Sequence, residues 1–162
     1  MKLTTRQLEV FDNIVTFLSS DASVFILRGY AGTGKTTMVE VVADYIAQSR
    51  QVVLMAPTGR AARVIKQKTG NNAKTMPKGC CEGMCIVSKE VKDISDSEFK
   101  FVFPIHASEK EGNVVAIVDE ASMLCSRKIE HELFKFGTDN LMEDLLTYVR
   151  PNFGGKVIFV GD

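Results

Sequence analysis

The amino-acid sequence predicts an α/β fold, with a mostly parallel sheet and helices on both of its faces. Apolar runs of five or six residues, typical of buried strands, alternate with stretches whose apolar residues recur at helical spacing. A glycine-rich turn joins one such run to one such stretch, which is the order of elements in a parallel βαβ unit. The chain has 162 residues and no net charge, so one ordinary domain without overall attraction to nucleic acid or membrane is expected.

The first predicted element is a helix that begins near Thr4 and precedes the first strand. Its apolar residues recur at helical spacing, namely Leu8, Phe11, Ile14, Val15 and Leu18. Gln7 has two possible roles at this stage. It can complete a capping box with Thr4, or its amide can contact the edge of an adenine base, and the spacing alone favours the cap.

The apolar strand 24–28 leads directly into Gly-Tyr-Ala-Gly-Thr-Gly-Lys-Thr-Thr at 29–37, which fits the phosphate-binding loop of P-loop NTPases. We expect Gly29, Gly32 and Gly34 to adopt positive φ, so that backbone amides point at phosphate oxygens. Lys35 would contact the β and γ phosphates, and Thr36 would bind Mg²⁺. The residues expected to bind the nucleotide are Gly29, Ala31, Gly32, Thr33, Gly34, Lys35, Thr36 and Thr37.

A helix is predicted over 35–48 and a second buried strand over 51–56. The residues that this helix is expected to bury are Met38, Val41, Val42, Tyr45 and Ile46. The turn Ala-Pro-Thr-Gly-Arg-Ala-Ala at 56–62 follows, with a further helix to about Gly70. Residues 59–81 contain no Asp or Glu but several basic residues, namely Arg60, Arg63, Lys66, Lys68, Lys74 and Lys78. Contact with a nucleic-acid backbone and a solvated helix face are about equally compatible with this pattern.

Residues 71–112 form the least regular part, and a small β insertion is expected there. Segments 86–91 and 99–103 are predicted to form a hairpin around a turn-forming stretch. The cysteines at 80, 81 and 85 suggest a metal site, but the sequence has no second Cys/His pair at zinc spacing. Unpaired thiols are therefore the favoured interpretation.

A strong signal returns with the apolar strand 113–118, which ends in Asp119 and Glu120. In P-loop ATPases a strand of this kind supplies one acid to the Mg²⁺ shell and one that orients or deprotonates the attacking water. We assign the first role to Asp119 and that of general base to Glu120; the alternative is that the pair caps the next helix. A helix over 139–149 and a strand over 156–160 complete the prediction. The residues this helix is expected to bury are Leu141, Met142, Leu145, Leu146 and Val149.

The order of these motifs resembles the first motor domain of superfamily 1 DNA helicases of the RecD-like (exonuclease V alpha-subunit-like) type, over nearly the whole chain. The motifs that carry the resemblance are Gln7, 29–36, 56–62, Asp-Glu-Ala-Ser-Met at 119–123 and Val-Gly-Asp at 160–162. The resemblance implies a RecA-like ATP-binding domain over 1–162, with ATP and Mg²⁺ as cofactors and 5′-to-3′ movement along single-stranded DNA. It also implies that Gln7 contacts adenine and that Pro57, Thr58 and Arg60 contact DNA.

The sequence departs from this family in two respects. Pro77 stands where the family has a histidine, in Thr-Met-Pro at 75–77. The second RecA-like domain, which in the family supplies an arginine facing the γ-phosphate, does not follow Asp162, so the chain is expected to be a fragment of a longer protein. Because such an arginine contributes about 10³–10⁵ to turnover in related enzymes, this chain alone should bind nucleotide but hydrolyse it poorly and unwind no duplex.

Other functions and locations can be weighed on the same residues. No apolar run is long enough to span a bilayer and the N-terminus lacks the apolar core of a signal peptide, so a cytoplasmic protein with no membrane contact is expected. A small-molecule or nucleoside kinase and an ATP-switched protein-binding module remain as alternatives. A GTPase is disfavoured because no Asn-Lys-x-Asp motif occurs.

Overall fold

The computed structural model describes residues 3–70, 73–75, 85–88, 99–105, 114–124, 134–150 and 153–162. The helices are α1 (Thr5–Ser19), α2 (Lys35–Ile46), α3 (Gly59–Thr69), the short 3₁₀ helix η1 (Ala121–Met123) and α5 (Leu141–Val149). The strands are β1 (Val24–Arg28), β2 (Gln51–Ala56), β3 (Ala73–Thr75), β4 (Cys85–Ser88), β5 (Phe99–Phe103), β6 (Val114–Val118), β7 (Phe134–Phe136) and β8 (Lys156–Gly161).

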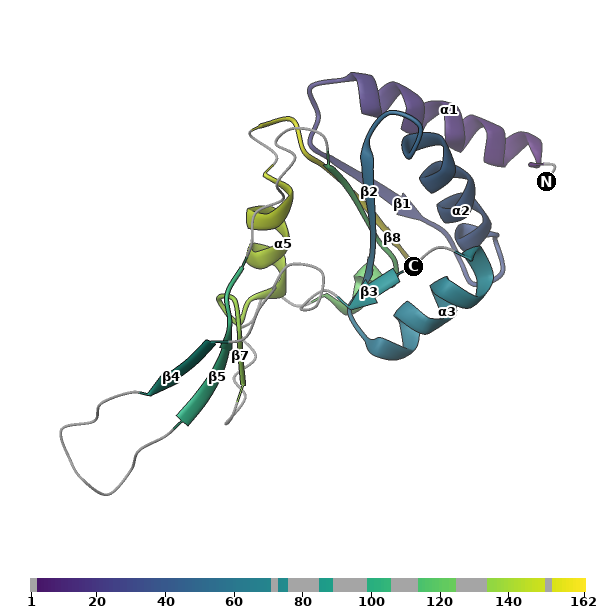
Figure 1. Cartoon of the computed structure of the whole chain (residues 1–162). Helices are drawn as coiled ribbons and strands as arrows, with labels where there is room; N and C mark the ends of the chain where they lie inside the picture. Colours follow the sequence, from purple (N-terminus) through teal and green to yellow (C-terminus); the bar gives the residue numbers. More distant parts are fainter. Residues whose placement is uncertain are drawn as a thin grey trace.

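The central sheet has five strands in the order β1-β8-β6-β2-β3, and every neighbouring pair is parallel. Four of these strands confirm the prediction to within one residue at either end. The fifth, β3, was not predicted, because its three residues Ala-Lys-Thr carry no hydrophobic pattern. In Figure 1 the sheet twists through the centre of the molecule, with α1, α2 and α3 on one side of it and α5 on the other.

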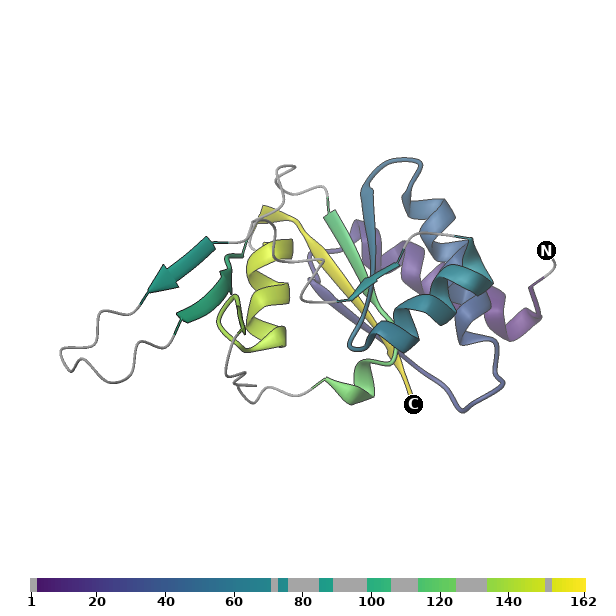
Figure 2. The ribbon, with the colours of Figure 1, turned by 60° about the horizontal axis from the view of Figure 1, so that its bottom comes forward.

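Helices cover both faces of the sheet, as predicted (Figures 1 and 2). The alternation of side chains along β6 shows the two layers directly. Val115 and Ile117 pack in the core that α1, α2 and α3 share, whereas Ala116 and Val118 pack in the core beneath α5. All five residues of β6 are buried, which explains the unbroken apolar run in its sequence.

Several side chains differ from the burial expected of them. Tyr45 is 40% exposed and Leu146 38% exposed, and Leu8 continues the apolar spacing of α1 but is 48% exposed. In α2 the buried positions include Val39 and Ala43. The ring of Tyr45 meets that of Phe11 edge to face at 5.3 Å, so it covers the contact between α1 and α2 from outside.

The predicted hairpin is present, and it has a third strand that the sequence did not indicate. β4 and β5 pair antiparallel, and β7 then pairs parallel to β5, with Phe103 opposite Phe136. The rings of these two residues stack at 4.7 Å, which fixes the base of the small sheet against α5. In Figure 2 β4 and β5 project away from the central sheet. Part of the predicted first segment, residues 89–91, lies outside the described residues.

Two negative findings apply to the described part of the chain alone. Within it, no helix is long and apolar enough to cross a membrane. Nor do the same residues contain a group of three His, Cys, Asp or Glu side chains that could hold a metal ion. Of the cysteines considered for a metal site, those at 80 and 81 lie outside the described residues.

Candidate nucleotide-binding site

The phosphate-binding loop joins β1 to α2 at the carboxyl edge of the sheet. Gly32 and Gly34 adopt φ of 82° and 84°, as expected, and Gly34 is the N-cap of α2. Gly29 does not adopt positive φ, so that prediction was wrong and the reason for glycine there is space. A Cβ at Gly29 would lie 2.8 Å from Oγ1 of Thr33, whose hydroxyl donates a 2.8 Å hydrogen bond to the carbonyl of Tyr30.

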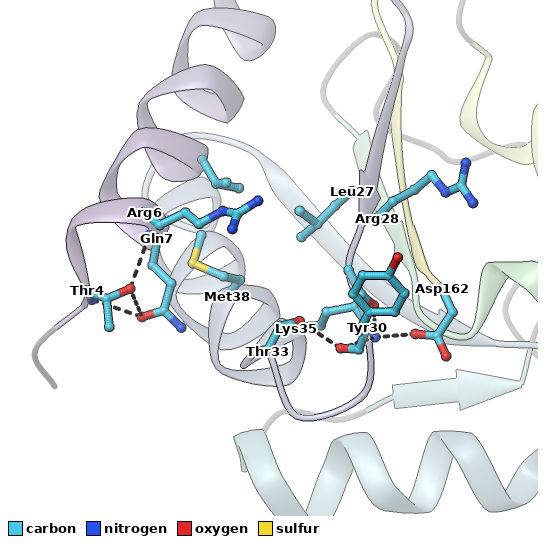
Figure 3. A pocket seen from close by; sticks show the side chains of 12 residues that line it. Thr4, Arg6, Gln7, Leu27, Arg28, Tyr30, Thr33, Lys35, Met38 and Asp162 are labelled. Atoms are coloured by element: carbon cyan, nitrogen blue, oxygen red, sulfur yellow. Dashed lines mark hydrogen bonds and ion pairs between the residues drawn. The ribbon is translucent and has the colours of Figure 1, made fainter.

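Lys35 is held at the mouth of this loop by three oxygen atoms. Its Nζ donates to the carbonyl oxygens of Gly29 and Tyr30, the latter at 3.2 Å, and forms an ion pair with the Asp162 carboxylate. Asp162 reaches this position because β8 lies beside β1, where the amide of Gly29 donates to the carbonyl of Gly161 at 3.1 Å. Figure 3 shows the Lys35 and Asp162 side chains meeting across the end of β1. Sequence reasoning gave Asp162 no role.

A hollow of about 550 Å³ adjoins the loop, between the start of α1 and the end of β1. Val10, Leu27 and Met38 supply apolar lining from α1, β1 and α2 respectively. Gln7 lines the same hollow, and Lys35 lies at its end nearest the loop. An apolar cavity with a few polar groups, of this size, is typical of a site for a small molecule such as a nucleotide.

Gln7 forms the capping box that its spacing predicts. The backbone amide of Thr4 donates to Oε1 of Gln7 at 2.9 Å, and the amide of Gln7 donates to Oγ1 of Thr4 at 3.3 Å. The other end of its side-chain amide faces the loop, since a Cβ at Gly34 would lie 2.5 Å from Nε2 of Gln7. Capping therefore uses Oε1 and leaves Nε2 directed at the loop, so the capping role of Gln7 and a contact with adenine are compatible.

The acid pair follows β6 at the same edge of the sheet. The amide of Asp119 donates to the carbonyl of Met55 at 3.0 Å, and Oδ1 of Asp119 accepts from the amide of Glu120 at 3.0 Å. Burial raises the pKa of Asp119, while that hydrogen bond and the nearby charge of Lys35 act in the opposite direction. Lys35 and Asp119 are 84 positions apart in the sequence, yet the charge of Lys35 acts on the pKa of Asp119.

Glu120 has an unusual backbone for a residue with a side chain. Its φ of 55° and ψ of 37° lie in the left-handed region, and its side chain makes no capping hydrogen bond to η1. The capping alternative for Glu120 is therefore wrong. Strained backbone of this kind costs on the order of 1–3 kcal/mol and clusters at functional sites, and here it presents an exposed carboxylate beside Asp119.

Thr36 and Asp119 supply the oxygen atoms that a magnesium ion prefers. Thr36 lies in the first turn of α2, and Asp119 directly follows β6. Both residues are partly buried rather than fully solvated. Hydroxyl and carboxylate oxygens are hard ligands, and Mg²⁺ is commonly bound through one or two such groups together with phosphates and waters. The donor set at these two residues therefore fits this ion.

The candidate DNA contacts lie after β2, at the same edge as the loop because the strands are parallel. Thr58 is the N-cap of α3, where its Oγ1 accepts from the amide of Ala61 at 3.2 Å. Pro57 is partly buried and Arg60 is exposed. The exposed basic residues of α3 are Arg60, Arg63, Lys66 and Lys68. Lys78, also part of the basic segment, lies outside the described residues.

Comparison with known proteins relates the whole chain to one family and to helicases. Residues 2–162 match the AAA domain family. An uncharacterized protein of Methanocaldococcus jannaschii is 29% identical over 147 residues, which cover 86% of this chain and 11% of that protein. The ATP-dependent RecD2 DNA helicase of Deinococcus radiodurans is 32% identical over 139 residues, covering 85% of this chain and 15% of the helicase. The chain thus spans less than a fifth of the length of these curated relatives.

Two solved structures share the fold over the whole chain. One contains two coordinating Pif1 helicases on forked double-stranded DNA, with a TM-score of 0.58, 19% identity and 34% of that chain covered. The other is a Bacteroides Pif1 helicase bound to ADP-AlF3 and single-stranded DNA, with a TM-score of 0.55, 20% identity and 32% covered. At this identity the two structures establish the fold alone. The chain therefore belongs to the AAA domain family, and its motifs and fold are those of the first RecA-like motor domain of RecD-like superfamily 1 helicases.

Proposed function

We propose that this chain binds Mg-ATP and hydrolyses it as the first motor domain of a DNA helicase that moves along single-stranded DNA. The observation that carries the proposal is the convergence of Lys35 with Asp119 and Glu120 at one edge of a parallel sheet. The Deinococcus relative, an ATP-dependent DNA helicase, supports the same activity here. The Bacteroides Pif1 structure, with its nucleotide analogue and single-stranded DNA, supports both ligands.

The phosphates would be bound by the loop and by the N-terminus of α2, where backbone amides are left free to donate. Residues 29–34 bring these amides to the phosphates, and Thr33, Thr36 and Thr37 add hydroxyl groups around them. Lys35 would exchange the carboxylate of Asp162 for oxygens of the β and γ phosphates, which carry more charge. Gln7 would donate from Nε2 to the base, because its Oε1 is engaged by Thr4.

Thr36 and Asp119 would hold Mg²⁺, which neutralises charge on the phosphate oxygens when it is bound. Glu120 would orient the attacking water and accept its proton. The exposed position of Glu120 and its left-handed backbone support this role, since both direct the carboxylate away from the core. Its neighbour Asp119 is the more buried of the two, and its pKa responds to the charge of Lys35 in the phosphate-binding loop.

Single-stranded DNA would lie across the carboxyl edge of the sheet, in contact with Pro57, Thr58 and Arg60. The basic face of α3 supports this proposal, because phosphate contacts come mainly from Lys and Arg side chains. A second RecA-like domain of the same full-length protein would close the nucleotide site and supply an arginine to the γ-phosphate. We place this activity in the cytoplasm, where ATP is abundant, and treat 1–162 as one domain with an insertion at about 71–112.

Two substitutions test the roles of the central residues. Lys35→Ala should weaken Mg-ATP binding by at least tenfold, since it removes a charge that contacts the phosphates. Glu120→Gln should bind Mg-ATP as the wild type does but lose turnover in the full-length protein. Affinity is measured by displacement of a fluorescent ATP analogue, and turnover by phosphate release with and without single-stranded DNA.

The outcomes separate the proposal from its alternatives. Equal loss of binding in both variants would show that the two roles are wrongly assigned. Transfer of the γ-phosphate to a nucleoside would indicate a kinase instead. Turnover stimulated by a protein partner but never by DNA would indicate an ATP-switched binding module.

A further inference from the structure

We propose that Arg6 is a nucleobase-binding residue, whose guanidinium covers the purine base in the hollow between α1 and β1. The inference rests on the proposed nucleotide site and extends it, because Arg6 belongs to none of the motifs described above. Arg6 would contribute equally to the affinity for adenine and guanine nucleotides, so any preference between the two bases would depend on Gln7.

The position of the side chain is the first argument. Arg6 lies in the first turn of α1 and lines the hollow next to Gln7. In Figure 3 its side chain extends from the helix across the hollow toward Leu27, whereas that of Arg28 points away from it. Arg6 is exposed, and no residue that the structure describes hydrogen-bonds or forms an ion pair with its guanidinium. Its five donors are thus available to a ligand.

The shape and lining of the hollow are the second argument. With the phosphates at Lys35, the base of a nucleotide has to lie farther from the loop, where the hollow continues beside Gln7 and Arg6. The side chains of Val10, Leu27 and Met38 form an apolar wall there, and Met38 is only 3% exposed. An aromatic base can rest one face on such a wall. The planar guanidinium can stack on its other face.

Arg6 also opposes the local stability of its own helix. A cation in the first turn is unfavourable, because the free amides there already carry partial positive charge. The first turn of α1 has no acidic residue that would offset this charge. Residues that break a local rule without compensation in the fold mark functional positions. An aromatic ring stacked on the guanidinium supplies a partner for this cation.

The chemistry of guanidinium also sets what Arg6 can distinguish. Stacking uses the π-face that every purine has, and the N–H groups of a stacked guanidinium lie parallel to the base rather than pointing at its 6-substituent. Nε2 of Gln7 faces the loop beside the hollow and is a polar atom that can meet the edge of the base. Substitution of Arg6 should therefore change the affinities for ATP and GTP by the same factor.

Competition binding on the whole chain tests this inference. The Kd values of Mg-ATP, Mg-GTP and inorganic tripolyphosphate are measured by displacement of a fluorescent ATP analogue, together with the Tm of each variant. Arg6→Ala should weaken ATP and GTP alike by about 3- to 10-fold, the range expected for stacking on a partly exposed cation. It should leave tripolyphosphate unchanged and leave the Tm equal or slightly higher. Arg6→Lys, which keeps the charge but not the plane, should recover less than half of the lost affinity.

The controls and contrary outcomes are distinct. Glu9→Ala, an exposed residue on the same helix and outside the hollow, should bind all three ligands as the wild type does. An equal loss of tripolyphosphate affinity in Arg6→Ala would make Arg6 a phosphate contact and overturn the inference. If Arg6→Ala binds both nucleotides with wild-type affinity, this inference is overturned but the proposed function is not. A wild-type chain that binds none of the three would overturn the proposed function and this inference with it.

Discussion

At the scale of single residues, the ion pair of Lys35 and Asp162 shows how the site balances its charge before nucleotide binds. The three donors of the lysine ammonium are engaged by two carbonyls and one carboxylate. Of these, the carboxylate carries a full negative charge in the place where a phosphate would otherwise be. Asp162 therefore competes with the nucleotide for Lys35, even though 62% of its side chain is exposed.

We predict that Asp162→Asn will bind ADP and ATP more tightly. In water, the Asp162 carboxylate and a phosphate about 4 Å from it would repel each other by on the order of 1 kcal/mol, which corresponds to about a fivefold change in Kd. The difference from the wild type should shrink as salt is added, because the side chain is exposed. Titration of a fluorescent nucleotide at two salt concentrations measures this, with Asp12→Asn, an exposed acid on α1, as the control. An unchanged Kd would mean that Asp162 does not oppose phosphate binding.

Burial raises the pKa of Asp119, and this predicts how the stability of the fold depends on pH. The folded protein holds this proton more tightly than the unfolded chain does. The resulting stability is present below the unfolded pKa and is lost as the pH rises through the folded pKa. Asp119→Asn resembles the protonated form, so it should have a higher Tm than the wild type at pH 7.5. This gap should narrow as the pH is lowered toward 4, and thermal unfolding at several pH values would reveal a constant gap if the assignment is wrong.

At the scale of elements, two cations from distant parts of the chain bind the end of α1. Nζ of Lys156, at the start of β8, donates to the carbonyls of Ser20 and Ala22 at 2.7 and 2.5 Å. Arg50, before β2, donates to the carbonyl of Leu18 at 3.2 Å. The carbonyls near a helix C-terminus lack partners within the helix and carry partial negative charge, so both contacts are favourable. Burial, and then the charge of Arg50, lowers the pKa of Lys156.

We predict that Lys156→Met will destabilise the fold by about 1–3 kcal/mol, because it removes the charge-assisted hydrogen bonds that a largely buried lysine makes to Ser20 and Ala22. At this chain length each kcal/mol lowers the Tm by about 2–4 °C. Nucleotide affinity should persist below the transition, since Lys156 lies at the opposite end of β8 from Asp162. Lys66→Met, a change at an exposed lysine of α3, should leave the Tm within 1 °C or so of the wild type. Similar Tm values for Lys156→Met and Lys66→Met would show that the contacts of Lys156 with the end of α1 do not stabilise the fold.

The elements also show what the sequence could predict and what it could not. Strands such as β6 were predictable because an unbroken apolar run is itself the signal of burial on both faces. β3 and β7 were not, since three residues carry no period and pair only because neighbouring strands offer an edge. The loop and acid pair were recognised as local motifs. The contact of Asp162 with Lys35 depends on β8 lying beside β1, which is a property of strand order rather than of any short segment.

At the scale of the whole molecule, parallel strands bring the ends of β1, β2, β6 and β8 to one edge. The nucleotide site uses residues that follow three of them, and the candidate DNA contacts follow the fourth, β2. Nucleotide and DNA would therefore bind to the same edge through adjacent strands.

A longer chain that carries a second RecA-like domain should hydrolyse ATP faster than this chain does alone. We expect the chain alone to bind Mg-ATP but to hydrolyse it slowly with or without single-stranded DNA. An arginine that faces the γ-phosphate, which a second domain would supply, contributes about 10³–10⁵ to turnover in related enzymes. The longer chain should show strong stimulation by single-stranded DNA. Phosphate release by both chains measures this, and Glu120→Gln in each controls for contaminating ATPases.

Each contrary result would change a different part of the proposal. Full activity of the chain alone would show that the site is complete without an arginine from elsewhere. Absence of a DNA response in both chains would reduce the basic face of α3, including Arg60, to a solvated surface. The expected result, a DNA response confined to the longer chain, would show that the edge shared by Lys35, Glu120 and Arg60 becomes a motor only when a second domain closes over it.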